Sequence, residues 1–333
     1  MPGNKWTVEQ LRADVSYWRA CILLTAARLD LFEFIGARDK TPAGFAAHYG
    51  GATAGWETYL NALCAMGLLR ERRRTYRNTV FSGQHMDHNA ALRLRPGYDG
   101  LRQWSSLAAA LTSGKRPEDQ IPFTSNRRQA RQLLNSLDLD ARAIAPYLLK
   151  KLPLKRSRTL LDVGGGLGTY AIAFCRGYPD RKATVVEHPN VAPLVRRAIG
   201  KTDMAQRVLV VGADIEREPL PRGFDVALLS NVLHAHGARE NQSLLRRVHR
   251  SLNPRGRLIV RDVFMRRDRT APQWGALFSV LLFLQSPRGR CYSLDEILRW
   301  LRAAGFAREK GPFRSSPLPF DPDSVLVARA QVK

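Results

Sequence analysis

Residues 160 to 174, LLDVGGGLGTYAIAF, constrain the fold more than any other part of this 333-residue chain. An apolar run ends in Asp162, glycines follow at positions 164, 165, 166 and 168, and a helix-like run comes next. Glycines let a backbone turn sharply and approach a ligand closely. The order of strand, glycine turn and helix therefore predicts the cradle that holds a nucleotide in doubly wound α/β folds.

The class of ligand follows from the residue that precedes the turn. Gly166, Gly168 and Ala171 fit the dinucleotide pattern G-x-G-x-x-G/A. Asp162, however, places a carboxylate at the strand end, where it would repel a pyrophosphate and attract a sulfonium or an amino group. The acid therefore favours S-adenosylmethionine over NAD.

Two further acids follow the next strands. Glu187 ends the second strand, 23 residues after Gly164, where a carboxylate can accept hydrogen bonds from the ribose hydroxyls of either cofactor. Asp214 follows the third strand in VGADI. Its carboxylate could accept from the adenine amino group or act as the N-cap of a helix, and both interpretations stay open.

Strands and helices alternate in the second half of the chain, after the polar linker 150–158. This alternation predicts a parallel sheet covered on both faces. We place a capped helix at Ser293–Phe306, and strands near 159–163, 183–187, 207–211, 224–229, 257–262 and 324–330.

The first half of the chain reads as helical. We expect a helix over 7–29, a short one starting at Thr41-Pro42, another over Ala54–Met66, two short strands within 68–79, and mostly helix over 90–150. Helix, turn, helix and a two-stranded wing form a winged-helix pattern. Because the helix 54–66 has almost no basic residues, we interpret it as a packing helix and not as a DNA-reading helix.

Charge and cysteine content narrow the class of protein. The chain has 53 Lys and Arg against 29 Asp and Glu, a net charge of +24. The basic residues are spread along the whole chain, so a solvated surface explains them better than a nucleic-acid groove. The four cysteines are scattered, without a C-x-x-C pair, and we expect neither a disulfide framework nor a metal site. With no apolar signal or membrane-spanning run, we expect a cytoplasmic protein.

Motifs along nearly the whole chain resemble one enzyme family. In order and spacing, they are LLDVGGGLGTYA, VVEHPNV, VGADI, LLSNVLHAHG, SLNPRGRLIVRD and LLFLQSPRGRCYSLDEILRWLRAAGF. They resemble the S-adenosylmethionine-dependent O-methyltransferases of the caffeate and acetylserotonin type and their bacterial tailoring relatives. The resemblance implies a Rossmann-like class I α/β domain with a mostly parallel seven-stranded sheet over 156–333. It also implies an α-helical winged-helix dimerisation domain over 1–90, and a helical linker over 91–155 that contributes to the substrate pocket.

The resemblance also implies roles for single residues. Ser230 stands where plant members carry a lysine near the adenine, His234 matches the general base, and Asp262 matches a supporting glutamate. Two plant acids are replaced here, by Ala235 and Cys291. The cofactor site is expected to consist of Asp162, Gly164, Gly166, Glu187, His188, Asp214, Ile215 and Ser230. The acceptor site is expected to consist of Trp104, Asn135, His236, Leu282 and Phe283, although core packing explains each apolar residue of this set as well.

Sheet geometry independently supports a role for His234. His234 follows the fourth strand and Asp262 ends the fifth, so in a doubly wound order both lie beyond neighbouring strand ends. A neutral histidine could then take the proton of a phenol while Asp262 orients its ring. A helix that begins soon after His234 would disfavour the imidazolium. His236 competes for the same role.

We therefore predict a homodimeric O-methyltransferase that acts on a hydroxyl of an aromatic or polyketide-like small molecule. Two alternatives stay open: a family member with N- or C-methylation or non-methylating chemistry, and a nucleic-acid-binding or nucleic-acid-modifying protein.

Overall fold

The computed structural model describes residues 17–113, 127–286, 288–318 and 321–331. These residues form two compact units, 1–102 and 103–333. The boundaries that we predicted at 90/91 and 155/156 stay a prediction. All four cysteines are free thiols. No helix in the described part of the chain is long and apolar enough to cross a bilayer.

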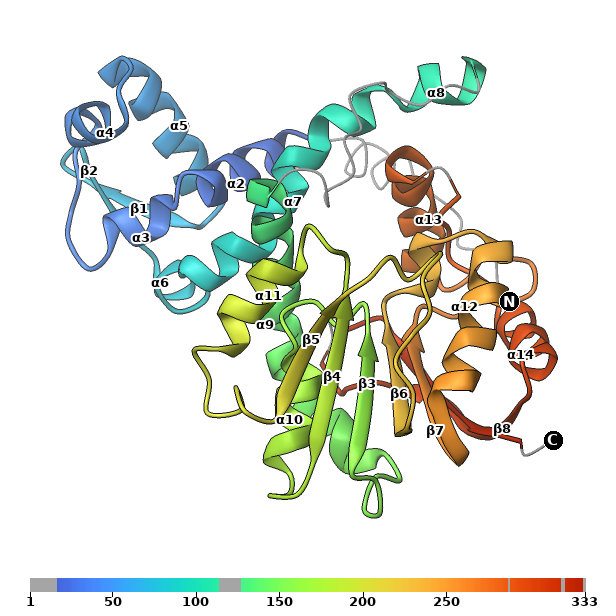
Figure 1. Cartoon of the computed structure of the whole chain (residues 1–333). Coiled ribbons are helices and arrows are strands. Elements are labelled where there is room, and N and C mark those ends of the chain that lie inside the picture. Colours follow the sequence, from blue (N-terminus) through green and yellow to red (C-terminus); the bar gives the residue numbers. More distant parts are fainter. Residues whose placement is uncertain (1–16, 114–126, 287, 319–320, 332–333) are drawn as a thin grey trace. The chain divides into compact units, whose positions relative to one another are not determined.

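The first unit consists of helices around a two-stranded antiparallel hairpin (Figure 1). Thr41 accepts a hydrogen bond from the backbone N–H of Gly44 and so caps a helix that begins at Pro42, as predicted. Only Trp18–Arg28 of the expected helix 7–29 is seen, because residues 7–16 lie outside the described part. The elements are α2 (Trp18–Arg28), α3 (Leu31–Ile35), α4 (Pro42–Tyr49), α5 (Thr53–Ala65), β1 (Leu69–Arg72), β2 (Thr75–Asn78), α6 (Val80–His85) and α7 (His88–Ser105), which runs into the second unit.

The second unit is built on a seven-stranded sheet with the order β5-β4-β3-β6-β7-β9-β8. Strands β3 to β7 are all parallel to one another, whereas β9 is antiparallel to both β7 and β8. The strands are β3 (Thr159–Val163), β4 (Lys182–Glu187), β5 (Val208–Gly212), β6 (Phe224–Ser230), β7 (Leu252–Asp262), β8 (Phe306–Arg314) and β9 (Ser324–Ala330). This arrangement confirms the predicted α/β class and the adjacency of β6 and β7. It adds β8, which the sequence analysis missed.

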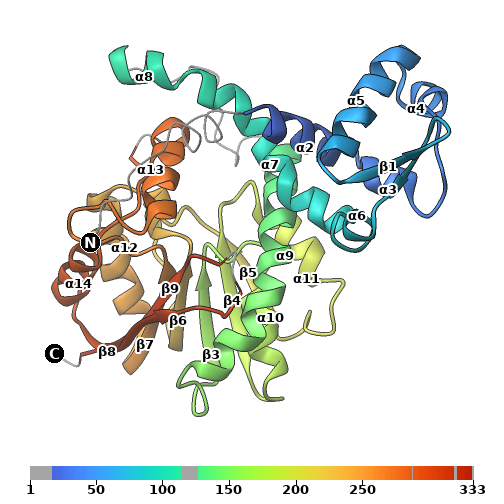
Figure 2. The same cartoon turned by 180° about the vertical axis from the view of Figure 1, so that it is seen from behind.

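Helices cover both faces of this sheet (Figures 1 and 2). Residues of α9 and α10, with Leu160 and Leu228 from the strands, form one apolar layer. Residues of α12 and α14, with Leu161 and Leu229, form the other. Consecutive residues of one strand therefore face opposite layers, as the pleat requires. The helices are α8 (Leu107–Ser113), α9 (Arg127–Lys151), α10 (Thr169–Arg176), α11 (Ala192–Ile199), the 3₁₀ turn η2 (Leu233–Ala235), α12 (Ala238–Ser251), α13 (Gln273–Gln285) and α14 (Leu294–Ala303).

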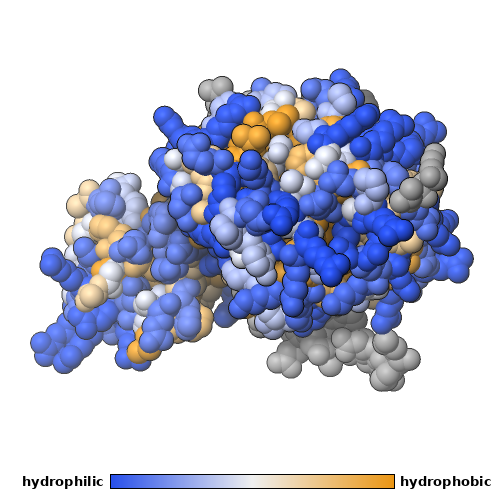
Figure 3. All heavy atoms as spheres, turned by 60° about the horizontal axis from the view of Figure 1, so that its bottom comes forward, coloured by the Kyte–Doolittle hydropathy of each residue, from blue (hydrophilic) through white to orange (hydrophobic). Residues whose placement is uncertain are grey.

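The charged residues are distributed over the surface. Figure 3 shows a face that is mostly hydrophilic, with small hydrophobic areas between the charged side chains. Several arginines form ion pairs, including Arg257 and Arg329 with Glu309 at 2.9 and 2.7 Å. This distribution fits the interpretation of the +24 charge as a solvated surface.

Candidate active site

The predicted cofactor residues come together at the carboxyl edge of the parallel strands. The glycine turn follows β3, Glu187 ends β4, Asp214 lies two residues beyond β5, and Ser230 ends β6. Glu187 accepts hydrogen bonds from the backbone N–H groups of Gly166 (3.0 Å) and His188 (2.9 Å). These bonds fix the Glu187 carboxylate against the glycine turn. Burial raises its pKa, and the two backbone donors offset part of that effect.

Asp162 lies beneath the glycine turn and is fully buried. A Cβ on Gly165 would come within 2.6 Å of the Asp162 carboxyl carbon, so only glycine fits over this acid. Neither Asp162 oxygen has a side-chain partner among the described residues, and the backbone N–H of Ala171 offsets only part of the effect of burial on its pKa. Burial, together with the nearby charge of Glu187, raises the Asp162 pKa to about 7. Because its side chain is enclosed, Asp162 would act on a cofactor through its charge.

These features fit S-adenosylmethionine. Asp162 is a buried carboxylate without a side-chain partner among the described residues, and the sulfonium and amino groups of this cofactor would bring a positive charge to it. Gly164 adopts φ 68°, and a Cβ there would come within 2.9 Å of Val232, so this position of the turn requires glycine. Glu187 is the residue that would hold the ribose.

Asp214 and Ser230 both form hydrogen bonds within the protein. One Asp214 oxygen accepts from the backbone N–H of Glu216 at 2.9 Å within a turn. No helix begins there, because β5 is followed by turns and then β6, so the interpretation of Asp214 as a helix N-cap was wrong. Ser230 Oγ accepts from Arg261 Nη1 at 3.4 Å. Arg261 is itself buried between Asp321 and Asp323, at 2.8 and 2.7 Å.

This Arg261 cluster was missed by the sequence analysis. Arg261 follows the apolar run 258–260 in β7, and nothing in a single sequence pairs it with acids 60 and 62 residues away. Burial raises the pKa of Asp323 to about 6 although Arg261 opposes the shift, and the charge of Asp262 adds to it. The cluster therefore places charge directly beside the pair described next.

His234 and Asp262 form a buried pair, as the adjacency of β6 and β7 predicts. His234 Nδ1 lies 2.8 Å from Asp262 Oδ1, and the backbone N–H of His234 donates to Oδ2 at 3.3 Å. The side chains are 13% and 3% exposed. Phe278 of α13 packs against the imidazole, with ring centroids 5.0 Å apart. With Nδ1 held by the carboxylate, Nε2 is the nitrogen that remains for an acceptor.

The pKa of His234 is raised. Burial by itself would lower it, but the charge and hydrogen bond of Asp262 outweigh burial, and Asp323 adds to the rise. This direction corrects the expectation that a nearby helix start would disfavour the imidazolium. The carboxylate is closer than the helix, and it dominates.

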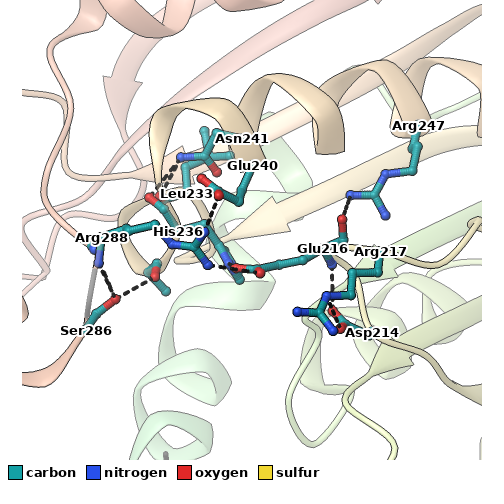
Figure 4. A network of polar contacts seen from close by, with 12 residues as sticks. Asp214, Glu216, Arg217, Leu233, His236, Glu240, Asn241, Arg247, Ser286 and Arg288 are labelled. Atoms are coloured by element: carbon teal, nitrogen blue, oxygen red, sulfur yellow. Dashed lines mark hydrogen bonds and ion pairs between the residues drawn. The ribbon is translucent and has the colours of Figure 1, made fainter.

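His236 is not paired with the His234 ring. Its Nδ1 lies 2.7 Å from Glu216 Oε1, in a polar network that Figure 4 shows. Glu216, just beyond Asp214 and Ile215, was also missed by the sequence analysis. The network therefore connects the cofactor-side loop after β5 with the turn that carries His234.

Apart from His236, which follows η2, the expected acceptor residues lie on the helices α7, α9 and α13. Trp104 of α7 is 40% exposed, and the preceding Gln103 accepts a hydrogen bond from Gln285 of α13 at 2.8 Å. Asn135 of α9 is half-buried, and its neighbour Leu134 reaches the glycine turn. Leu282 of α13 is buried and packs with Cys291, Val263 and Met265, so core packing explains it. His188, Ile215 and Phe283 are half-buried.

Cys291 occupies the place of the second plant acid without replacing its charge. It is buried, and burial raises the pKa of its thiol to about 12. A thiol with that pKa is neutral at physiological pH and fills space as a small apolar group. Within the described residues, only Asp262 is hydrogen-bonded to the His234 ring.

A model of the O-methyltransferase domain matches residues 120–307, more than half of the chain. The chain belongs to this family. It is an S-adenosylmethionine-dependent O-methyltransferase. The resemblance inferred from the motifs is thereby confirmed.

Relatives and solved structures agree with this assignment over almost the full length. The chain is 29% identical to the tetracenomycin polyketide synthesis 8-O-methyl transferase TcmO of Streptomyces glaucescens, over 96% of this chain and 95% of that one. It is 28% identical to the 3-hydroxy-5-methyl-1-naphthoate 3-O-methyltransferase of Streptomyces sahachiroi, over 90% and 89%. The crystal structure of human N-acetylserotonin methyltransferase in complex with SAM superposes with a TM-score of 0.81 at 22% identity and covers both chains fully.

Proposed function

We propose that this O-methyltransferase methylates a phenolic or enolic hydroxyl of a fused-ring aromatic or polyketide-like molecule, with His234 as the general base. The His234–Asp262 pair carries the proposal, because it presents one imidazole nitrogen beside the predicted cofactor site. The names of the relatives TcmO and the naphthoate 3-O-methyltransferase refer to a polyketide and to a fused-ring aromatic compound. The apolar side chains of α13 support an aromatic acceptor.

Each residue then has a defined task. When bound, S-adenosylmethionine supplies an electrophilic methyl group. Glu187 holds the ribose, and the Asp162 charge favours the cationic cofactor. His234 Nε2 takes the proton of the acceptor hydroxyl while Asp262 holds Nδ1–H and stabilises the imidazolium. A phenol with a pKa near ~10 needs this assistance at neutral pH.

Assembly and compartment belong to the same proposal. We propose a homodimer formed through the first unit, supported by the family resemblance and by exposed apolar side chains there, such as Trp18 and Phe81. Sedimentation at micromolar concentration should give twice the chain mass. The four free thiols support a reducing, cytoplasmic setting.

The pH dependence of catalysis should report the state of His234. Because its pKa is raised, kcat/KM should rise with pH and level off above an apparent pKa higher than ~6.5. In Asp262→Asn, the charge that raises the pKa is gone while burial remains, so the rising limb should move to lower pH at a reduced plateau. A rising limb that stays in place in Asp262→Asn would contradict the assignment. Initial rates across pH 5 to 9 give the pH dependence of kcat/KM for both enzymes.

Cofactor binding should be coupled to a proton at Asp162. A bound cation lowers the pKa of this acid from about 7, so binding of S-adenosylmethionine near neutral pH should release a proton, and affinity should increase with pH. Calorimetry in two buffers with different ionisation enthalpies counts the proton.

Asp162→Asn and a neutral-sulfur ligand provide the controls for this coupling. S-adenosylhomocysteine lacks the sulfonium charge, so its binding should release fewer protons than the binding of S-adenosylmethionine. Asp162→Asn should abolish the difference between the two ligands, whereas an unchanged difference in this variant would rule Asp162 out.

A further inference from the structure

The turn that carries His234 is too short to provide hydrogen-bond partners for all of its own backbone carbonyls. In η2 and its flanks, Ala235 donates to Val232 and His236 donates to Leu233, and the remaining carbonyls need partners from elsewhere. Three successive carbonyls, at 234, 235 and 236, accept hydrogen bonds from one segment beyond α13, and the carbonyl of His236 also accepts from Asn241 Nδ2 of α12 at 3.3 Å. The donors are the Arg290 backbone N–H to His234 (2.8 Å), Ser286 Oγ to Ala235 (3.0 Å) and the Tyr292 hydroxyl to His236 (2.6 Å).

Ionic contacts connect the same segment to α12 and to the loop after β5 (Figure 4). Arg288 pairs with Glu240 of α12 and with Glu216, at 3.3 Å for the latter. Glu216 also binds the His236 ring at 2.7 Å. Arg288 is 54% exposed, so its ion pairs contribute modestly. Tyr292 is 2% exposed, which makes its hydroxyl the stronger constraint.

The segment is fixed to the helix that contacts the His234 ring. Ser286 N–H donates to Leu282 of α13, and Cys291 N–H donates to Ser279 Oγ of the same helix. Phe278, one residue before Ser279, packs against the imidazole. The backbone and the ring of His234 are therefore held by α13 and the described residues that follow it, 278–286 and 288–292.

We propose that Tyr292, Ser286 and Arg288 are positioning residues that align His234 Nε2 with the acceptor hydroxyl, with Glu216 bracing the turn from the cofactor side. This inference rests on the proposed function of His234 as the base. None of the four residues takes a proton itself. They restrict the imidazole to one orientation, and proton transfer depends steeply on that orientation.

Tyr292→Phe tests the proposal, with Tyr49→Phe as a matched control. Tyr49 also donates its hydroxyl to a backbone carbonyl, that of Leu29 at 2.8 Å, but it lies in the first unit. Single-turnover methyl transfer is measured with a hydroxynaphthoate and with a nitro-substituted hydroxynaphthoate whose hydroxyl is already ionised at the assay pH. Calorimetry with S-adenosylhomocysteine and thermal unfolding verify that the variant is folded.

A misaligned base predicts a selective defect. Tyr292→Phe should slow transfer to the weakly acidic acceptor roughly 10- to 100-fold and to the ionised one far less, while Tyr49→Phe changes neither. Equal losses in transfer rate for both acceptors would show that Tyr292 has only a structural role and would overturn the proposal. So would full activity on both.

A second readout needs no acceptor. In the wild type, the His234 Nδ1–H bonded to Asp262 should give a protected, downfield proton NMR signal, and Tyr292→Phe should broaden or shift it. An unchanged signal in Tyr292→Phe would overturn the positioning role. If the wild type methylates no phenol, the proposed function fails, and this signal still decides whether Tyr292 orients the histidine.

Discussion

His234→Gln should lose between roughly 10²- and 10⁴-fold in the rate of methyl transfer, the contribution that a positioned general base makes. Glutamine keeps a polar side chain of similar reach but cannot take a proton at neutral pH. Because the His234 ring is not expected to bind the cofactor, calorimetric affinity for S-adenosylmethionine should stay within a few-fold. Single-turnover assays with purified enzyme separate the two quantities.

A second histidine of the same unit serves as the control. His249 of α12 packs against Phe306, with ring centroids 5.0 Å apart. His249→Gln should retain turnover. If His234→Gln also retained full turnover while binding cofactor, the base would be another group or the reaction would need none.

Glu187→Ala should weaken S-adenosylmethionine binding by roughly 10- to 100-fold. Hydrogen bonds to a charged group contribute about 1.5–3 kcal/mol, and the carboxylate is expected to accept from the ribose hydroxyls. The change also leaves the N–H groups of Gly166 and His188 without their acceptor, so the glycine turn should loosen. Calorimetry gives the affinity, and thermal unfolding without ligand gives the cost to the fold.

Glu187→Gln separates these two effects. Its amide oxygen can still accept one backbone hydrogen bond, so the turn should keep most of its stability while the loss of charge still weakens binding. Glu71→Gln is a control at another carboxylate that accepts from a backbone N–H, that of Arg74. Unchanged affinity in Glu187→Ala would place the ribose elsewhere.

The strand ends of the parallel sheet could be predicted because a local sequence pattern, an apolar run followed by an acid, indicates each of them. Asp162 and Glu187 each close an apolar run, Asp262 lies two residues beyond one, and parallel strands bring such ends to one edge. The pair of His234 with Asp262 followed from the adjacency of two strands.

The edge strand β8 could not be predicted in the same way. Its sequence FAREKGPFR contains a glycine, a proline and several charges, and its pairing with β9 has register shifts. Such residues are typical of edge strands, where one side needs no partner, but also of loops. Only the completed sheet distinguishes the two.

Contacts between charged side chains that are far apart in the sequence could not be predicted either. The partners of His236 and Arg261 lie 20 and 60 residues away, and no periodicity joins them. The raised pKa of His234 comes mainly from Asp262, whose charge outweighs both burial and the helix start, so reasoning from the helix start gave the wrong direction. Burial of Asp162 likewise depends on how the glycine turn packs over it.

The most direct test of the central claim is to incubate the enzyme with methyl-labelled S-adenosylmethionine and a panel of fused-ring phenols, and to locate the label by mass spectrometry and NMR. We predict a labelled methoxy group on at least one phenol with the wild type, and a loss of that product in His234→Gln. Cofactor binding without any labelled phenol, or a label attached only to carbon or nitrogen, would contradict the account.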